Sequence, residues 1–547
     1  MDGHGWYVGL GRILRCGDGL IWAALAVLGA IAATITELAT RHGIATFGDS
    51  GAYLGMAENL RHGRGLTLPF DLPFDRFTPL QVYAFHGAVP STHFPPGYPI
   101  ALTLFSPPGV AVTTGARVLG CVLAAATVIL SGRLTRRLLA PPRRWFQLAT
   151  PILLIGVLGQ PVGFLLLHAE LGSEALFIVL VQASLLCTFR YLETPSRWRL
   201  VALTAATAAS ILTRHVGLFL VVLLIPTILI AGRMPRAARA RSAASFAIGA
   251  VAPWAAFMVY GRLLASGSAG SGVSTLAYHP LGGTVGDLTT VLGSWIVAYH
   301  APEAVHASAL LALVMLIALG LVAAVRLPHS DAVRRNTMMA ALALPVYIGF
   351  VFVSQTFVDA GIPINDRLLS PIRPVITALS VAAFAAITTR LRPAYAGALL
   401  ALVVVVAVVP RWADQRDLVR TYARAQHPYR ELESIRASPR STLIMSPSAD
   451  VVTIAIQHSA ITTARPRIAI TGRLNRCFAR DLAENAALLN YYGGYVYFIL
   501  GLQYPDTTTP SELGRLVRLD PVTTSPTGTL FRVAPIAGAP SPSPLPC

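Results

Sequence analysis

The sequence contains no lysine, so all 43 basic residues of the 547-residue chain are arginine. Charge of either sign is scarce: charged residues make up 12% of the chain, against about 25% in an ordinary soluble domain. Apolar residues make up 54%, and the mean hydropathy is +0.61. This composition excludes a soluble globular protein. Many charge-free runs approach the ~20 residues that cross the hydrocarbon layer as a helix, so we expect a polytopic membrane protein.

Cysteine is scarce as well. The five cysteines, Cys16, Cys121, Cys187, Cys477 and Cys547, show no CxxC spacing, which argues against a thiolate zinc site or a redox motif. Their spacing leaves open whether Cys477 and Cys547 pair. The first apolar run is long and no small-residue cleavage site follows it, so we interpret it as a retained span whose amino terminus stays inside.

Eleven apolar segments are predicted to cross the membrane. They are 19–38, 111–132, 146–167, 175–192, 198–213, 215–232, 243–261, 305–325, 338–356, 371–389 and 393–410. With the amino terminus inside, the arginine clusters between spans, such as 133–144 and 233–241, all fall on the cytoplasmic side. Membrane topology therefore accounts for most of the net charge of +18, and we expect no nucleic-acid partner.

The predicted fold class is an α-helical polytopic membrane protein with a small mixed α/β domain at its carboxyl end. Residues 1–410 form the transmembrane domain, in which the first outer loop spans 39–110, and residues 411–535 form the extracytoplasmic α/β domain. That domain is predicted to begin with an amphipathic surface helix and to hold strands at 441–446, 461–466 and 494–501, helices at 451–458 and 482–491, and a hairpin at 521–533. The Pro/Ser-rich segment 536–547 is predicted to be a disordered tail.

The first outer loop is the most informative stretch. Asp49 and Ser50 stand before apolar residues at helical spacing, and Gly63 and Gly65 can end the helix that they begin. Asp49 has two interpretations: a helix N-cap, or a catalytic carboxylate held by a helix in the membrane interface.

Five short patterns along residues 45 to 375 resemble a known family, the polyprenyl-phosphate-dependent glycosyltransferases of the GT-C superfamily. The resemblance is to the group that contains protein O-mannosyltransferases and the aminoarabinose transferase of lipid A. The patterns are Asp49 with Tyr53 and A-x-N-L-x-x-G-x-G (57–65), PPGYP (95–99), Ser173-Glu174, Thr213-Arg214-His215 and D-R-L-L-x-P (366–371). Many relatives have two acidic residues together in the first loop, whereas Ser50 follows Asp49 here.

The resemblance implies an inverting transfer of a sugar from a lipid phosphate carrier to an acceptor hydroxyl on the outer face. Asp49 matches the family's base position, and an alcohol needs a carboxylate within reach to accept its proton. The leaving phosphate needs cationic donors, which Arg367, Arg214 and His215 can supply from the outer ends of spans. Glu174 matches the family's second acidic position.

The other candidate substrate-binding residues have structural alternatives of comparable weight. Glu170 lies one turn from Glu174 and shares its face only if that turn is helical. Asp366 has the alternative of a local ion pair with Arg367, and the Arg214–His215 pair that of an interfacial anchor. For His93 a packed or solvated loop histidine is the favoured alternative, and for Tyr53 a structural aromatic at the interface.

We expect no cofactor and no metal ion. The expected partners are a polyprenyl-phosphate sugar as donor, a glycan, lipid or protein acceptor, and membrane lipids of the plasma (inner) membrane. The arginine-rich, lysine-free composition indicates a GC-rich genome and favours mannose or arabinose transferred to a cell-envelope glycan. A transporter or lipid-carrier flippase is the main rival, but transporters place charges and broken helices at the membrane midplane. A non-catalytic scaffold is the third alternative.

The arginine asymmetry predicts that residues 39–110 and 411–547 face away from the cytoplasm. A cysteine introduced near Gly65 should react with an impermeant maleimide in intact cells. A cysteine near Ala238, in an arginine-rich loop, should react only after the cells are opened. The reverse labelling would contradict this orientation.

Overall fold

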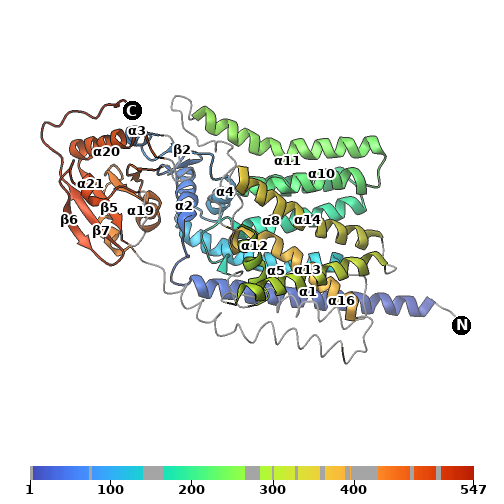
Figure 1. Ribbon diagram of the computed structural model, residues 1–547. Coiled ribbons are helices and arrows are strands. Elements are labelled where there is room, and N and C mark those ends of the chain that lie inside the picture. The colour runs from blue at the N-terminus through green and yellow to red at the C-terminus, as the bar shows by residue number, and fades with distance from the viewer. Residues whose placement is uncertain are drawn as a thin grey trace.

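The computed structural model describes residues 4–72, 77–138, 164, 166–264, 284–297, 301–326, 331–357, 364–388, 395, 429–467, 474–500 and 507–547. Long helices run side by side and a mixed α/β domain lies at one end of them (Figure 1). The helices of the bundle are α1 (His4–Thr40), α5 (Val112–Leu138), α8 (Glu174–Glu193), α9 (Arg197–Thr213), α10 (Phe219–Ala231), α11 (Arg236–Leu264), α12 (Thr284–Ser294), α13 (Glu303–Arg326), α14 (Asp331–Phe357) and α16 (Arg373–Thr388).

Six helices in the described part of the chain are long and apolar enough to cross a membrane. They are Trp22–Thr40, Val112–Leu138, Glu174–Glu193, Arg236–Gly261, Asp331–Phe357 and Asp366–Phe384. Their length and apolar composition make this an integral membrane protein.

The prediction of eleven spans is not confirmed. The predicted spans 146–167 and 393–410 lie almost entirely outside the described residues, as does most of the predicted amphipathic helix after residue 411. The predicted span 215–232 corresponds to the apolar helix His215–Ala231, and the predicted span 305–325 lies within α13, a helix of 24 residues. The segment 198–213 forms α9, a helix of 17 residues. Hydropathy therefore identified all three segments as helices.

Short elements close one end of the bundle, which we call the capped end. The first long loop contributes α2 (Gly48–Arg61), β1 (Thr67–Leu68), α3 (Pro79–Ala84), β2 (Val89–Pro90) and α4 (Gly97–Leu104). The short helices η1 (His215–Leu218), α15 (Asp366–Leu369) and η2 (Ser370–Ile372) stand where later chain segments reach the same end. The helix predicted from Asp49 is confirmed as α2, and Gly63 and Gly65 follow it with φ of 72° and 74°, a backbone conformation that favours glycine.

The carboxyl-terminal domain is a five-stranded mixed sheet in the order β4-β3-β5-β7-β6. Its strands are β3 (Ile444–Ser446), β4 (Ile461–Thr462), β5 (Gly494–Ile499), β6 (Asp520–Thr524) and β7 (Gly528–Val533), and its helices are η4 (Arg430–Ile435), α19 (Ala449–Ile456), α20 (Phe478–Tyr492) and α21 (Pro510–Leu513). β3 pairs in parallel with β4 and β5, whereas β7 is antiparallel to both of its neighbours. The mixed α/β pattern expected from the sequence is present.

The first loop and this domain share one hydrophobic core, which contains Met56 and Leu68 of the loop together with Ile444 and Val452 of the domain. α2 lies so close to α19 that a Cβ atom added at Gly51 would stand 2.7 Å from the carbonyl oxygen of Asp450. Because any side chain at that position would force the helices apart, glycine is required there. The loop is therefore held between the bundle and the domain.

A buried carboxylate also joins the loop to the domain. Asp71 Oδ1 accepts a hydrogen bond of 2.8 Å from the backbone N–H of Thr462 in β4. Burial raises the pKa of Asp71 to about 6, although that hydrogen bond opposes the rise. The charged form of Asp71 is thus accommodated at a desolvation cost, which the bond to β4 partly offsets.

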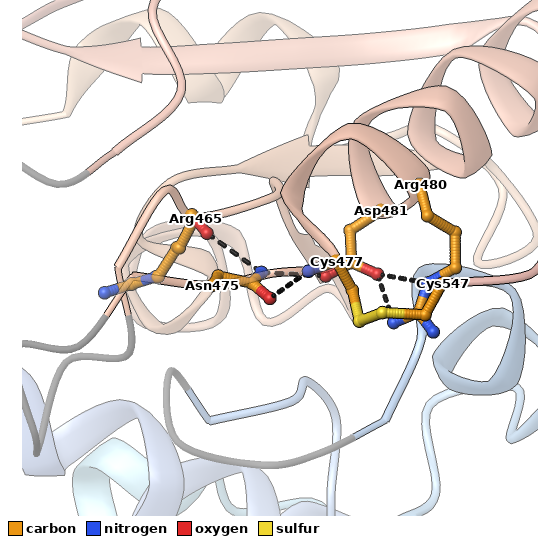
Figure 2. The surroundings of a disulfide bond; sticks show 6 residues. All are labelled: Arg465, Asn475, Cys477, Arg480, Asp481 and Cys547. Atoms are coloured by element: carbon orange, nitrogen blue, oxygen red, sulfur yellow. Dashed lines mark hydrogen bonds and ion pairs between the residues drawn. A yellow bond between two sulfur atoms is a disulfide. The ribbon is translucent and has the colours of Figure 1, made fainter.

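A disulfide between Cys477 and Cys547, 70 residues apart, fixes the chain end against the start of α20 (Figure 2). Asn475 holds the chain next to the disulfide in place. Its Oδ1 accepts a hydrogen bond from the Cys477 N–H at 3.0 Å, and its Nδ2 donates to Asp481 at 3.0 Å. The composition of 536–547 predicts disorder, but the structure gives this segment a defined path. The cross-link ties the last residue of the segment to Cys477, a contact that composition does not reveal.

Candidate active site

Glu174 is the centre of a charged cluster at the capped end. It is the first residue of α8, and only 2% of its side chain is exposed. Its Oε1 accepts a hydrogen bond from Arg214 Nη1 and another, of 2.7 Å, from Arg367 Nη2. A buried carboxylate is tolerated when cationic donors neutralise it, and here two arginines do so. Three chain segments are thereby tied to one oxygen atom.

Asp49 joins the cluster from α2, where its Oδ2 lies 3.1 Å from Arg367 Nη2. The N-cap of α2 is Phe47, and Ser50 Oγ accepts from the Phe47 N–H at 2.9 Å. The alternative that Asp49 is the helix N-cap is therefore wrong: Ser50 satisfies that end of the helix. The Asp49 side chain is 42% exposed, so its carboxylate is accessible, whereas that of Glu174 is not.

Arg367 connects the two carboxylates. It lies in α15, where the Asn365 side chain accepts from the Leu368 N–H at 3.0 Å and fixes the helix start. The Arg367 guanidinium carbon lies 3.5 Å from the centroid of the Phe47 ring, a cation–π contact that orients its plane. Its Nε is buried and has no hydrogen-bond partner within the described part of the chain. Arg367 thus retains an unused donor beside Asp49 and Glu174.

Arg214 approaches from the break between α9 and η1, where its backbone is extended with φ −149° and ψ 133°. Arg214 Nη1 also donates to Ser173 Oγ at 3.3 Å. The Tyr53 hydroxyl lies 2.8 Å from the same Ser173 Oγ, and the Tyr53 ring packs edge-to-face on Phe94 and Tyr98. Burial raises the pKa of Tyr53, so it remains a neutral phenol. Tyr53 and Ser173 therefore hold the Arg214 side chain in position.

His215 has a different role from the cationic phosphate ligand that the sequence suggests. Its Nδ1 lies 2.8 Å from Trp254 Nε1, which can only donate, so Nδ1 accepts and Nε2 carries the hydrogen. Nε2 then donates to the backbone carbonyls of Thr92 and His93, at 3.2 and 3.1 Å. In this arrangement His215 is neutral. It holds the loop before α4 in place.

His93, Asp366 and Glu170 also stand apart from the cluster. His93 contributes its backbone carbonyl to His215, and its ring packs on Phe94. Asp366 Oδ1 accepts from Trp295 Nε1 at 2.5 Å, while the neighbouring Arg367 points to Asp49 and Glu174. Glu170 forms a β-bridge with Ala45 in a non-helical segment, so the helical face that it would share with Glu174 does not exist.

The cluster combines two carboxylates and two guanidinium groups, which cancel in formal charge. Phe47 and Trp254 were missed by sequence reasoning, because nothing in the sequence indicates that these rings would contact Arg367 and His215. In the described residues no three His, Cys, Asp or Glu side chains are grouped as metal ligands. A divalent cation at Asp49 and Glu174 would have to displace Arg367, so these residues do not fit a metal site.

Replacing Glu174 by glutamine should destabilise the capped end, because Arg214 and Arg367 would lose the buried charge that they share. Breaking a buried ion pair costs about 3–5 kcal/mol. Glu193→Gln is the matched control: Glu193 ends the same helix, pairs with Arg137 at 2.7 Å and is 27% exposed, so its loss should cost about 1 kcal/mol or less. Thermal unfolding of the detergent-purified variants measures both. Equal unfolding midpoints for the Glu174 and Glu193 variants would contradict the assignment of Glu174 as the buried centre of the cluster.

No family model matches the sequence, and no curated protein matches it. Among solved structures, the chain is similar over most of its length to the apo oligosaccharyltransferase of Archaeoglobus fulgidus, with 13% identity, coverage of 87% of this chain and 69% of that chain, and a TM-score of 0.50. The same archaeal enzyme, AglB, in complex with an inhibitory peptide and a dolichol-phosphate gives 12% identity, 87% and 69% coverage and 0.49. ArnT from Cupriavidus metallidurans, bound to undecaprenyl phosphate, gives 14% identity, 95% and 99% coverage and 0.44.

At these identities the likeness establishes the fold and nothing finer. The expected resemblance in architecture is confirmed by the similarity to the apo oligosaccharyltransferase, which extends over 87% of this chain. The chain has a GT-C-like fold.

Proposed function

We propose that this protein is an inverting glycosyltransferase that moves a sugar from a polyprenyl-phosphate donor to an acceptor hydroxyl. The observation that carries the proposal is the pair formed by an accessible carboxylate, Asp49, and a guanidinium, Arg367, 3.1 Å apart at the capped end. A base for the acceptor and a cation for the leaving phosphate are the two groups that this reaction needs. The GT-C-like fold, shared with an oligosaccharyltransferase, supports the same class of reaction.

Asp49 and Glu174 differ in solvent exposure, and we assign them different roles on that basis. Asp49 is the more accessible one and takes the proton from the acceptor hydroxyl as the acceptor oxygen bonds to the anomeric carbon. The bond from that carbon to the phosphate oxygen breaks on the opposite side, its electron pair leaves with the phosphate, and the configuration inverts. Glu174 is buried and bonded to both arginines, so it positions them and does not meet the substrate.

The arginines retain donors for the phosphate. Within the described part of the chain, the side-chain hydrogen bonds of Arg214 all come from Nη1 and those of Arg367 all come from Nη2. Preorganised cations stabilise the charge that grows on a departing phosphate. Because both arginines are already held by Glu174, they need little reorganisation when the donor binds.

The capped end is assigned to the extracytoplasmic side of the plasma (inner) membrane. The arginine clusters lie between spans at the other end of the bundle, as the positive-inside rule requires of cytoplasmic loops. The Cys477–Cys547 disulfide supports the same orientation, since disulfides persist in oxidising compartments. Sugar and acceptor are identified by incubating membranes with radiolabelled polyprenyl-phosphate mannose or arabinose and following the label to glycan, lipid or protein.

Asp49→Asn should separate catalysis from structure. Asparagine keeps the size of the side chain but cannot take a proton, and a general base contributes ~10²–10⁴-fold to a rate. We expect normal expression and normal donor binding, with single-turnover transfer reduced by a factor in that range. Asp287→Asn is the control, because Asp287 is an exposed aspartate in the first turn of α12. Normal transfer by the Asp49 variant would rule out its role as the base.

Arg367→Lys and Arg214→Lys should each impair transfer, because an ammonium on a flexible stem cannot reproduce the bidentate guanidinium geometry. The loss of one hydrogen bond to a charged group, ~1.5–3 kcal/mol, corresponds to roughly tenfold or more in kcat/KM. Arg137→Lys is the control, since Arg137 pairs with Glu193 at the other end of the bundle. Unchanged kcat/KM in the Arg367 variant would eliminate its role as a phosphate ligand.

A further inference from the structure

A second site lies between the first loop and the carboxyl-terminal domain. A cavity of about 420 Å³ opens between α2, the end of α3, the segment leading into β3 and the segment after α19. This volume lies within the ~300–1,000 Å³ range of small-molecule sites. The cavity is separate from the charged cluster. Glu58, in its wall, follows Asp49 by about two and a half helical turns and so lies on the opposite face of α2.

Two arginines face this cavity, Arg64 from the first loop and Arg440 from the domain. Arg64 Nε is buried and has no hydrogen-bond partner within the described residues. Burial lowers the pKa of Arg64 and the nearby charge of Arg440 lowers it further, while the charge of Glu58 opposes the shift only in part. The carboxylate in the wall, Glu58, already lies 3.5 Å from Arg61 and 3.6 Å from His62. The cavity therefore carries positive charge whose repulsion an anion would relieve.

Two strained residues line the same cavity. His86 has φ 49° and Gln457 has φ 55°, and these are the two non-glycine residues with positive φ in the described part of the chain. Each lies just past the end of a helix, α3 and α19, where glycine usually adopts this conformation without strain. Strain of this kind costs of order 1–3 kcal/mol and concentrates at ligand sites. His86 and Gln457 therefore place an imidazole and an amide at positions where glycine would avoid the backbone strain.

The remaining wall is suited to a sugar. Ser441, Thr442 and Ser459 bring hydroxyl groups to it, and Tyr83 brings an aromatic ring that packs on Tyr492 at 4.7 Å. Hydroxyl and amide groups can exchange hydrogen bonds with a polyhydroxylated ligand, whereas arginine recognises carboxylate and phosphate oxygens.

We infer that this cavity binds an acidic saccharide, whose oxyanion lies between Arg64 and Arg440 and whose hydroxyl groups contact His86, Gln457 and Ser459. The oxyanion is a phosphate or a carboxylate, and both offer the arginines the same paired oxygens. The site goes beyond the proposed transfer reaction and does not depend on it, since Asp49 lies on the other face of α2.

Isothermal titration of the purified full-length protein tests the site with glucose 1-phosphate, glucuronic acid, glucose and inorganic phosphate. We expect either acidic sugar to bind more tightly than glucose and inorganic phosphate, and the tighter of the two to identify the oxyanion. Arg64→Gln and Arg440→Gln should each weaken that binding by roughly tenfold or more. Arg518→Gln is the control, because Arg518 is an exposed arginine on Asp520 in the same domain. Asp49→Asn should bind the probe normally.

His86→Gly distinguishes a ligand contact from a helix end. Glycine removes the backbone strain, so we expect the thermal midpoint to rise while affinity for the acidic sugar falls several-fold. A raised midpoint with unchanged affinity would overturn the role of His86. Failure of both acidic sugars to bind, equal binding of glucose or inorganic phosphate, or binding indifferent to both arginine substitutions would overturn the site. None of these outcomes bears on transfer by Asp49.

Discussion

Glu174 is a buried carboxylate that two arginines share, and the positions of the other charged groups in the candidate site depend on it. Desolvating a carboxylate is expensive, and one cation with good geometry rarely compensates fully. Here Arg214 and Arg367 come from chain segments 153 residues apart and meet at one oxygen atom. Their convergence fixes the ends of α8, α9 and α15 relative to one another. Arg367 then reaches Asp49, which brings α2 into the same arrangement.

The two faces of α2 serve different purposes. One face presents Asp49 and Tyr53 to the arginines and Ser173. The other packs against α19, with Gly51 at the point of closest approach, and borders the cationic cavity. This short helix is held in place by the shared core of the loop and the domain.

Much of the fold could be predicted because the signals are local. Hydropathy identifies apolar helices, and Ser50 and the two following glycines mark the ends of α2 in the sequence. The strands of the carboxyl-terminal domain follow from turn residues and β-branched runs. The number of spans is not confirmed, because α9 and the helix His215–Ala231 are at the lower limit of a crossing and two predicted spans lie outside the described residues. The pairing of Cys477 with Cys547 stayed open, because a disulfide is a contact between distant residues.

The sequence by itself determined that the protein is a membrane protein and which residue types gather at one end of its helices. Through the resemblance of its short patterns to the GT-C family, it also identified Asp49, Glu174, Arg214 and Arg367 as candidates. Only the tertiary structure decided how they pair. In the structure, Asp49 accepts a hydrogen bond from Arg367 and does not cap the helix. His215 donates to backbone carbonyls and does not join the charged cluster. Pairing depends on three-dimensional proximity between segments over a hundred residues apart, and no local pattern encodes that proximity.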